Sequence, residues 1–167
     1  LTEALSGVEA VVHCAGAMQG DATAQARDTG QATERLLAAM TRAGTPRLVL
    51  AGSLSIYGYA DLPPLAKVTE SLRSEPAPER RDAYTRAKLA QEALCRDWAT
   101  AAPGRDLWIL RIGALWGPTR LANAHLGPAF GPVLLRAREG ELPLAHVEGT
   151  AQALLRAART APEGGIE

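Results

Sequence analysis

The chain contains three short apolar runs, at residues 8–16, 46–53 and 106–113. None of them alternates apolar with polar residues, so each fits a strand that is buried on both faces. Two longer stretches between these runs, 28–43 and 82–100, carry apolar residues at helical spacing. Strands of this kind that alternate with helices predict an α/β fold, a doubly wound parallel sheet with helices on both faces.

The ends of these elements also follow from local sequence. Gly44 comes directly after the first helical stretch, and Asp82 is a suitable N-cap for the second. Further helical stretches are predicted near residues 131–139 and 147–160. The segment 58–81 is long and rich in proline and charge, so we expect it to be a lid or a substrate loop.

The carboxyl ends of the three predicted strands carry small residues. Ligands of open parallel sheets bind beyond these ends, so the three segments should line one crevice. They are Cys14–Gly16, Ala51–Ser53 and Ile112–Ala114.

The amino-acid composition argues against several classes of function. Eighteen basic and eighteen acidic residues cancel, and aromatic residues make up only 4% of the chain, which gives no support to nucleic-acid or anionic-membrane binding. No apolar run approaches the roughly 18 residues that span a bilayer. The two cysteines lie far apart and the three histidines lack ligand spacing, so we expect free thiols, no metal site and a cytoplasmic location.

One pair of residues stands out against this composition. The chain has sixteen arginines and two lysines, and Lys88 lies four residues after Tyr84 in "DAYTRAKLAQE". Residues at positions i and i+4 share one face of a helix. A phenol with a pKa near 10 is a poor base at neutral pH, but a neighbouring ammonium favours its phenolate form. The pair can therefore accept a proton from an alcohol or return one to a carbonyl. The same spacing also fits a half-buried tyrosine beside a lysine that extends its charged end to solvent.

A third polar group is predicted at the same crevice. Ser53 comes directly after the second strand in "LVLAGSLSIYG". Its hydroxyl can cap a turn, or it can bind the reacting oxygen and orient it towards Tyr84.

These segments resemble the extended short-chain dehydrogenase/reductase family, also called the NAD-dependent epimerase/dehydratase family. The resemblance runs through "AVVHCAG", "ERLLAAMTRAG", "RLVLAGSLSIYG", "YTRAKLAQEAL", "ILRIGALWGP" and "HVEGTAQALL", in the family's order. It implies a Rossmann-like fold, a catalytic triad of Ser53, Tyr84 and Lys88, and NAD or NADP as cofactor. The residues that it places against the cofactor are Cys14, Ala15, Gly16, Ala51, Ile112, Tyr84 and Lys88.

The resemblance also implies an organisation. Residues 1–118 would form a partial dinucleotide-binding domain, and residues 119–167 a partial substrate-binding region with a C-terminal helix. The family's Gly-rich turn has no counterpart in the chain, so we expect a fragment whose sheet is incomplete at the N-terminus and which is inactive by itself. A homodimer through helices 29–43 and 82–100 is expected from the resemblance alone.

Departures from the family pattern bear on the substrate. Leu54 and Ser55 replace the Asp-Glu pair of the sugar dehydratases, which argues against 4,6-dehydration, and Ala114 replaces an asparagine that holds a sugar diphosphate. Thr29 replaces the family's helix asparagine, and the link from Pro143 to His146 is short. An oxidoreductase or epimerase acting on a sugar nucleotide or similar substrate remains the main hypothesis. A hydroxysteroid- or flavonol-type reductase and a non-catalytic NAD(P)-binding regulator are the alternatives.

Overall fold

A computed structural model of the chain describes residues 1–59, 62–63, 66–118, 129–130, 133–134 and 142–166. Its main sheet consists of β1 (Ala10–His13), β2 (Arg47–Ser53) and β3 (Asp106–Ile112). All three strands are parallel, and β2 lies in the middle. The predicted parallel α/β architecture is confirmed.

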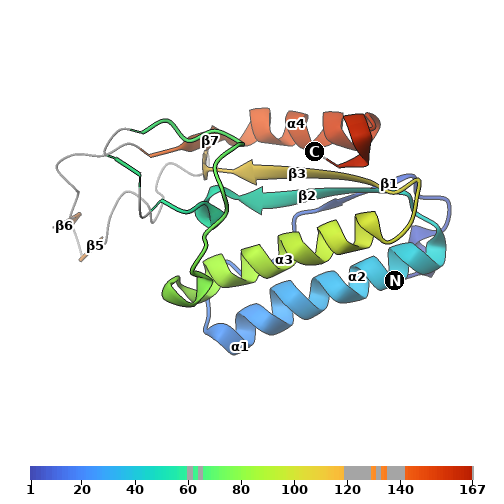
Figure 1. Cartoon of the computed structure of the whole chain (residues 1–167), viewed down its shortest axis with the longest axis horizontal. Helices are drawn as coiled ribbons and strands as arrows, with labels where there is room; N and C mark the ends of the chain where they lie inside the picture. The colour runs from blue at the N-terminus through green and yellow to red at the C-terminus, as the bar shows by residue number, and fades with distance from the viewer. Residues whose placement is uncertain (60–61, 64–65, 119–128, 131–132, 135–141, 167) are drawn as a thin grey trace.

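Helices cover both faces of this sheet (Figure 1). On one face lie α1 (Ala22–Gln25), the π-helical turn η2 (Ala26–Gln31), α2 (Ala32–Ala43) and α3 (Ala83–Thr100), and on the other lies α4 (Val147–Arg159). Alternate side chains of β2 pack against the helices on opposite faces of the sheet. Leu48 and Leu50 belong to the core under α2 and α3, whereas Val49 packs with Leu154 of α4.

The first helical region begins earlier than its apolar spacing predicts. It starts at Ala22 rather than near residue 28, because the Asp21 carboxylate accepts a hydrogen bond from the Ala24 amide at 2.9 Å and caps the helix. The turn η2 then inserts a π-helical register before α2. The end is as predicted, since Gly44 adopts a left-handed conformation with a φ of 72°.

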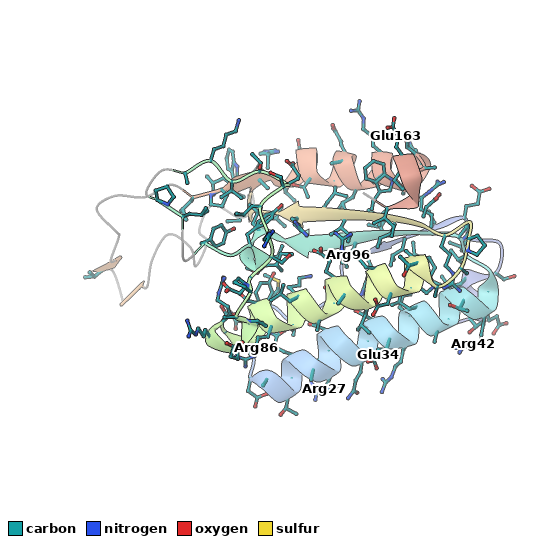
Figure 2. All side chains as sticks on the ribbon, viewed as in Figure 1. Arg27, Glu34, Arg42, Arg86, Arg96 and Glu163 are labelled. Carbon is teal, nitrogen blue, oxygen red and sulfur yellow. The ribbon has the colours of Figure 1, made fainter. Side chains whose placement is uncertain are left out.

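Helix α3 follows its prediction closely. The Asp82 carboxylate accepts a hydrogen bond from the Thr85 amide at 2.8 Å, and the helix runs to Thr100. Glu92 is buried on this helix and accepts hydrogen bonds from Arg111 of β3 at 2.6 and 3.1 Å. Arg96 binds the same carboxylate, and Figure 2 labels its side chain between α3 and the sheet. This cluster fastens α3 to β3.

Short strands lie beyond the carboxyl edge of the main sheet. Strand β4 (Ala114–Trp116) pairs in parallel with β7 (Leu144–His146), and β5 (Ala129–Phe130) pairs antiparallel with β6 (Val133–Leu134). The strand β6 contradicts the helix expected near 131–139 at its described residues, and the rest of that stretch lies outside the described part. A Cβ at Gly113 would lie 2.1 Å from the Pro143 carbonyl oxygen, so only glycine allows this close approach.

The second half of the long 58–81 segment is anchored to the strand end. Arg81 donates hydrogen bonds to the carbonyl oxygens of Ser55 at 2.8 Å and Tyr57 at 3.1 Å, and it pairs with Glu75 at 2.7 Å. Short 3-10 turns complete the fold: η1 (Glu3–Leu5), η3 (Leu54–Ile56), η4 (Pro78–Arg80) and η6 (Glu163–Gly165).

Within the described part of the chain, no helix combines the length and the apolar character needed to cross a membrane.

Candidate active site

The sheet and α3 position the three predicted catalytic side chains. Ser53 is the last residue of β2, Tyr84 lies in the first turn of α3, and Lys88 lies one turn further along the same helix. Ser53 is buried, and Tyr84 and Lys88 are half-buried. The chain thus places all three residues where α3 meets the carboxyl end of β2.

The ammonium of Lys88 points to the end of the central strand. Its Nζ donates a hydrogen bond to the Ala51 carbonyl oxygen at 2.9 Å and another to Gln91 Oε1 at 2.7 Å. Burial lowers the pKa of Lys88 below its ordinary value. Two of the three N–H groups have acceptors in the described part of the chain, which leaves one for a ligand.

Ser53 is held by a neighbour that the sequence analysis did not assign to the site. Its Oγ donates to Ser55 Oγ at 3.0 Å and accepts from the Ser55 amide at 3.2 Å. Ile112 of β3 pairs in register with Ser53, so the predicted cofactor residue and the predicted catalytic serine lie side by side. Ser55 therefore fixes the rotamer of the serine hydroxyl.

The loop after β1 approaches the lysine from the other side. A Cβ added at Gly16 would lie 3.9 Å from Lys88 Nζ and 3.4 Å from Thr29 Oγ1. Thr29 Oγ1 accepts a hydrogen bond from the Ala17 amide at 2.9 Å, and Gln25 Nε2 donates to the Ala17 carbonyl oxygen at 3.1 Å. Thr29 and Gln25, which the π-helical turn and α1 bring beneath the loop, thus hold both polar groups of Ala17.

A buried polar cluster lies beneath Lys88. His13 of β1, Thr33 of α2 and Gln91 of α3 are each at most 5% exposed. His13 Nε2 lies 2.8 Å from Thr33 Oγ1 and 3.1 Å from Gln91 Nε2. Sequence reasoning missed Gln91, although a glutamine three residues after Lys88 on the inner face of a helix is a signal for it.

This arrangement can accommodate the nicotinamide end of a dinucleotide. Cys14, Ala15 and Gly16 are exposed at the end of β1, and Ala51 is partly exposed at the end of β2. Their small side chains leave the sheet edge open to a flat ring beside the Lys88 ammonium. The donor set and the open edge fit the expected cofactor at this position.

A separate hollow of the described structure lies away from these residues. It measures about 870 Å³ and follows the outer edge of β3, where residues from both faces of the sheet line it. Tyr84 and Lys88 are not among its lining residues. Among the described residues, no cluster of histidine, cysteine and acidic side chains could hold a metal ion.

Burial of His13 predicts an acid-sensitive fold. Burial and the neighbouring Lys88 lower the pKa of His13 from 6.5 to about 4. Between these pH values the unfolded chain binds a proton that the folded chain does not, so stability should fall as the pH drops from 6.5 to 4. The expected loss is up to about 3 kcal/mol. Urea denaturation at several pH values measures it, and His13→Gln should flatten the dependence whereas His146→Gln should leave it unchanged.

Solved structures similar to this chain share its fold. MoeE5 in complex with UDP-glucose and NAD is 23% identical with a TM-score of 0.74, and the match covers 99% of this chain and 56% of that one. The UDP-Glc/GlcNAc 4-epimerase of Campylobacter jejuni is 17% identical with a TM-score of 0.71, over 95% of this chain and 55% of that one. The chain therefore spans about half the length of these proteins.

A third structure is closer in sequence over a shorter region. A double mutant of DesIV, a dTDP-glucose 4,6-dehydratase from Streptomyces venezuelae with NAD and DAU bound, is 27% identical with a TM-score of 0.59. The match covers 70% of this chain and 35% of that one. A search of curated proteins gives no match. The model of the NAD dependent epimerase/dehydratase family matches residues 1–166, and the chain belongs to that family.

Proposed function

We propose that this chain carries the catalytic residues of an NAD(P)-dependent oxidoreductase or epimerase. Its substrate would be a sugar nucleotide, or a similar molecule, with a hydroxyl or keto group at the reacting carbon. The observation that carries the proposal is the direction of Lys88, whose ammonium reaches the end of β2 one helical turn from Tyr84. Family membership and the nucleotide sugars bound by MoeE5 support it.

In this proposal each side chain has one task. Tyr84 takes the proton of the substrate hydroxyl, or returns it to the keto oxygen in the reverse direction. The Ser53 hydroxyl, which donates to Ser55 Oγ in the free protein, would turn its hydrogen to the same oxygen and hold it in place. Lys88 favours the phenolate through its charge, and its remaining N–H binds a ribose hydroxyl. The cofactor, when bound, supplies the hydride chemistry.

The proposed cofactor contacts come from the loop after β1 and from the ends of the other strands. The backbone and small side chains of Cys14, Ala15 and Gly16 would lie along the nicotinamide end of the cofactor, with Ala51 and Ile112 beneath it. The hydrogen bonds of Thr29 and Gln25 to Ala17 support this placement of the cofactor, because they hold the loop in one conformation. Residues 1–118 would form the dinucleotide-binding part, and residues 119–167 the substrate region.

We also propose a homodimer through helices 29–43 and 82–100. A groove of about 530 Å³ lies between these helical regions, and one of its walls carries Ala83, Ala87, Ala90 and Ala93 of α3. Small side chains allow helices of a second subunit to approach closely. A monomeric sedimentation value for the native protein would contradict the dimer.

A substrate screen tests the proposed function. The native protein is incubated with NAD or NADP and with either a nucleotide sugar (UDP-glucose, UDP-glucuronic acid or dTDP-glucose) or an apolar alcohol or ketone. Both the products and the absorbance of reduced nicotinamide are followed. Product with net reduction indicates a dehydrogenase, and product without it indicates an epimerase. Turnover restricted to apolar alcohols and ketones would contradict the sugar-nucleotide assignment.

A further inference from the structure

Gln91 is the buried residue that directs the Lys88 side chain. It lies on α3 three residues after Lys88, on the inner face of the helix, and has no solvent exposure. Its Oε1 accepts a hydrogen bond from the Lys88 ammonium at 2.7 Å, the shorter of the two that Lys88 makes to described residues. An acceptor at this place holds the charged end of a long, flexible side chain in one position.

The orientation of the Gln91 amide is determined by residues from two other elements. Its Nε2 donates to Thr33 Oγ1 of α2 at 2.9 Å and to the Ala15 carbonyl oxygen at 3.3 Å, and it lies 3.1 Å from His13 Nε2 of β1. The Thr33 hydroxyl and the Ala15 carbonyl oxygen accept the two hydrogen bonds of the NH₂ group, so Oε1 is the atom left facing Lys88.

Thr33 is itself oriented by the helix before it. Its hydroxyl donates to the Thr29 carbonyl oxygen at 2.7 Å, so its lone pairs face Gln91 and His13. The chain of contacts thus runs from the π-helical turn through Thr33 and Gln91 to the ammonium. Every buried polar side-chain atom in the described part of the chain has a partner, so this cluster is fully satisfied.

We propose that Gln91 is a positioning residue for Lys88, and that Thr33 and His13 act on the lysine through the Gln91 amide. The inference rests on the proposed function, because it concerns the residue that would favour the Tyr84 phenolate. With Gln91 and Ala51 as fixed acceptors, two N–H groups of the ammonium are engaged and the third has a defined direction. Gln91 does not touch substrate or cofactor in this account.

The surroundings of Lys88 supply little compensating charge. Within the described residues, the titratable neighbours that interact with it are Cys95 of its own helix and Cys14 and His13 from the β1 side, and burial keeps the Cys95 thiol neutral by raising its pKa to about 12. Burial lowers the pKa of Lys88 and burial also keeps His13 neutral at pH 7. The hydrogen-bond acceptors of the ammonium in the described part of the chain are neutral, namely the Gln91 amide and the Ala51 carbonyl oxygen.

The test measures Lys88 directly. The native protein is labelled with ε-¹³C-lysine, the Lys88 signal is assigned by its loss in Lys88→Arg, and its pH titration is followed by NMR. In Gln91→Met the ammonium loses an acceptor, so its pKa should fall further. In Gln91→Glu the acceptor is restored with a negative charge, so the pKa should rise above that of the wild type. The exposed Lys67 should titrate identically in all variants.

Thr33→Val tests the indirect part of the inference. This variant removes a contact of Gln91 but none of Lys88, and it should move the Lys88 titration in the same direction as Gln91→Met. It also provides a second route to the answer if Gln91→Met does not fold. Gln152→Met, on the exposed face of α4, is the matched control and should leave the Lys88 signal unchanged.

Activity measurements distinguish a failure of the Gln91 proposal from a failure of the proposed function. We expect Gln91→Met to lower kcat by about 10- to 100-fold, a part of what a positioned acid–base group supplies, and Gln91→Glu to recover some of that loss. An unchanged Lys88 titration in both Gln91→Met and Thr33→Val would overturn the inference, even with an active wild-type protein. An inactive wild-type protein whose Lys88 titration still responds would instead overturn the proposed function.

Discussion

Replacing Tyr84 by phenylalanine should lower kcat by about 10²- to 10⁴-fold, because the variant keeps the aromatic ring and loses only the hydroxyl that exchanges the proton. The affinity for NAD or NADP should change little. The Lys88 contacts to Ala51 and Gln91 do not involve the phenol and should remain. Steady-state kinetics on the best substrate of the screen, together with calorimetric titration of the cofactor, measure both quantities.

The same variant provides its own control for folding. In the described part of the chain the Tyr84 hydroxyl donates no hydrogen bond to another residue, and the side chain is only half-buried. Its removal should therefore change the free energy of unfolding by no more than about 0.5 kcal/mol. Turnover within a few-fold of the wild type would show that Tyr84 is not the acid–base residue.

Replacing Glu92 by alanine should destabilise the fold by about 3–5 kcal/mol. Glu92 is 6% exposed, and its carboxylate binds Arg111 at two points, with distances of 2.6 and 3.1 Å. The pair raises the pKa of Arg111, and the arginine also lies 4.7 Å from the centre of the Tyr57 ring. Alanine would leave this partly buried guanidinium without its carboxylate. The pair with Arg96 adds less, because the Arg96 side chain is 43% exposed and solvent partly screens its charge.

Urea denaturation measures this loss against a matched substitution. Glu9→Ala removes a carboxylate from an exposed position before β1 and should change stability by no more than about 0.5 kcal/mol. Because Glu92 lies on the helix that carries Tyr84 and Lys88, we also expect its loss to weaken cofactor binding. Equal denaturation midpoints for the two variants would contradict the structural role of the Glu92 cluster.

The elements that the sequence predicts correctly are those with strong local signals. The three apolar runs become β1, β2 and β3, and Asp82 starts α3 as its side chain chemistry indicates. The sequence also predicts that the three strand ends lie close together, because the carboxyl ends of parallel strands lie at the same edge of a sheet. These two facts are enough to bring Ser53 and Lys88 to the same region.

The elements that the sequence does not predict depend on tertiary contacts. The start of the first helical region depends on Asp21, and its π-helical turn lets Thr29 bond the loop after β1. His13, Thr33 and Gln91 are separated by 20 and 58 residues and meet only because β1, α2 and α3 pack together. The close approach of Pro143 to Gly113 likewise brings together two segments that are distant in the sequence, and no local sequence pattern predicts it.

The fate of the hydrogen on the reacting carbon shows whether the proposed hydride transfer takes place. The native protein is given NAD or NADP and a substrate deuterated at the carbon that bears the reacting hydroxyl, and the recovered dinucleotide and product are analysed by mass spectrometry. Hydride transfer predicts that deuterium appears in the nicotinamide ring or returns to the product, and that none is lost to water. Product whose deuterium has been replaced by solvent hydrogen, with an unlabelled dinucleotide, would contradict hydride transfer.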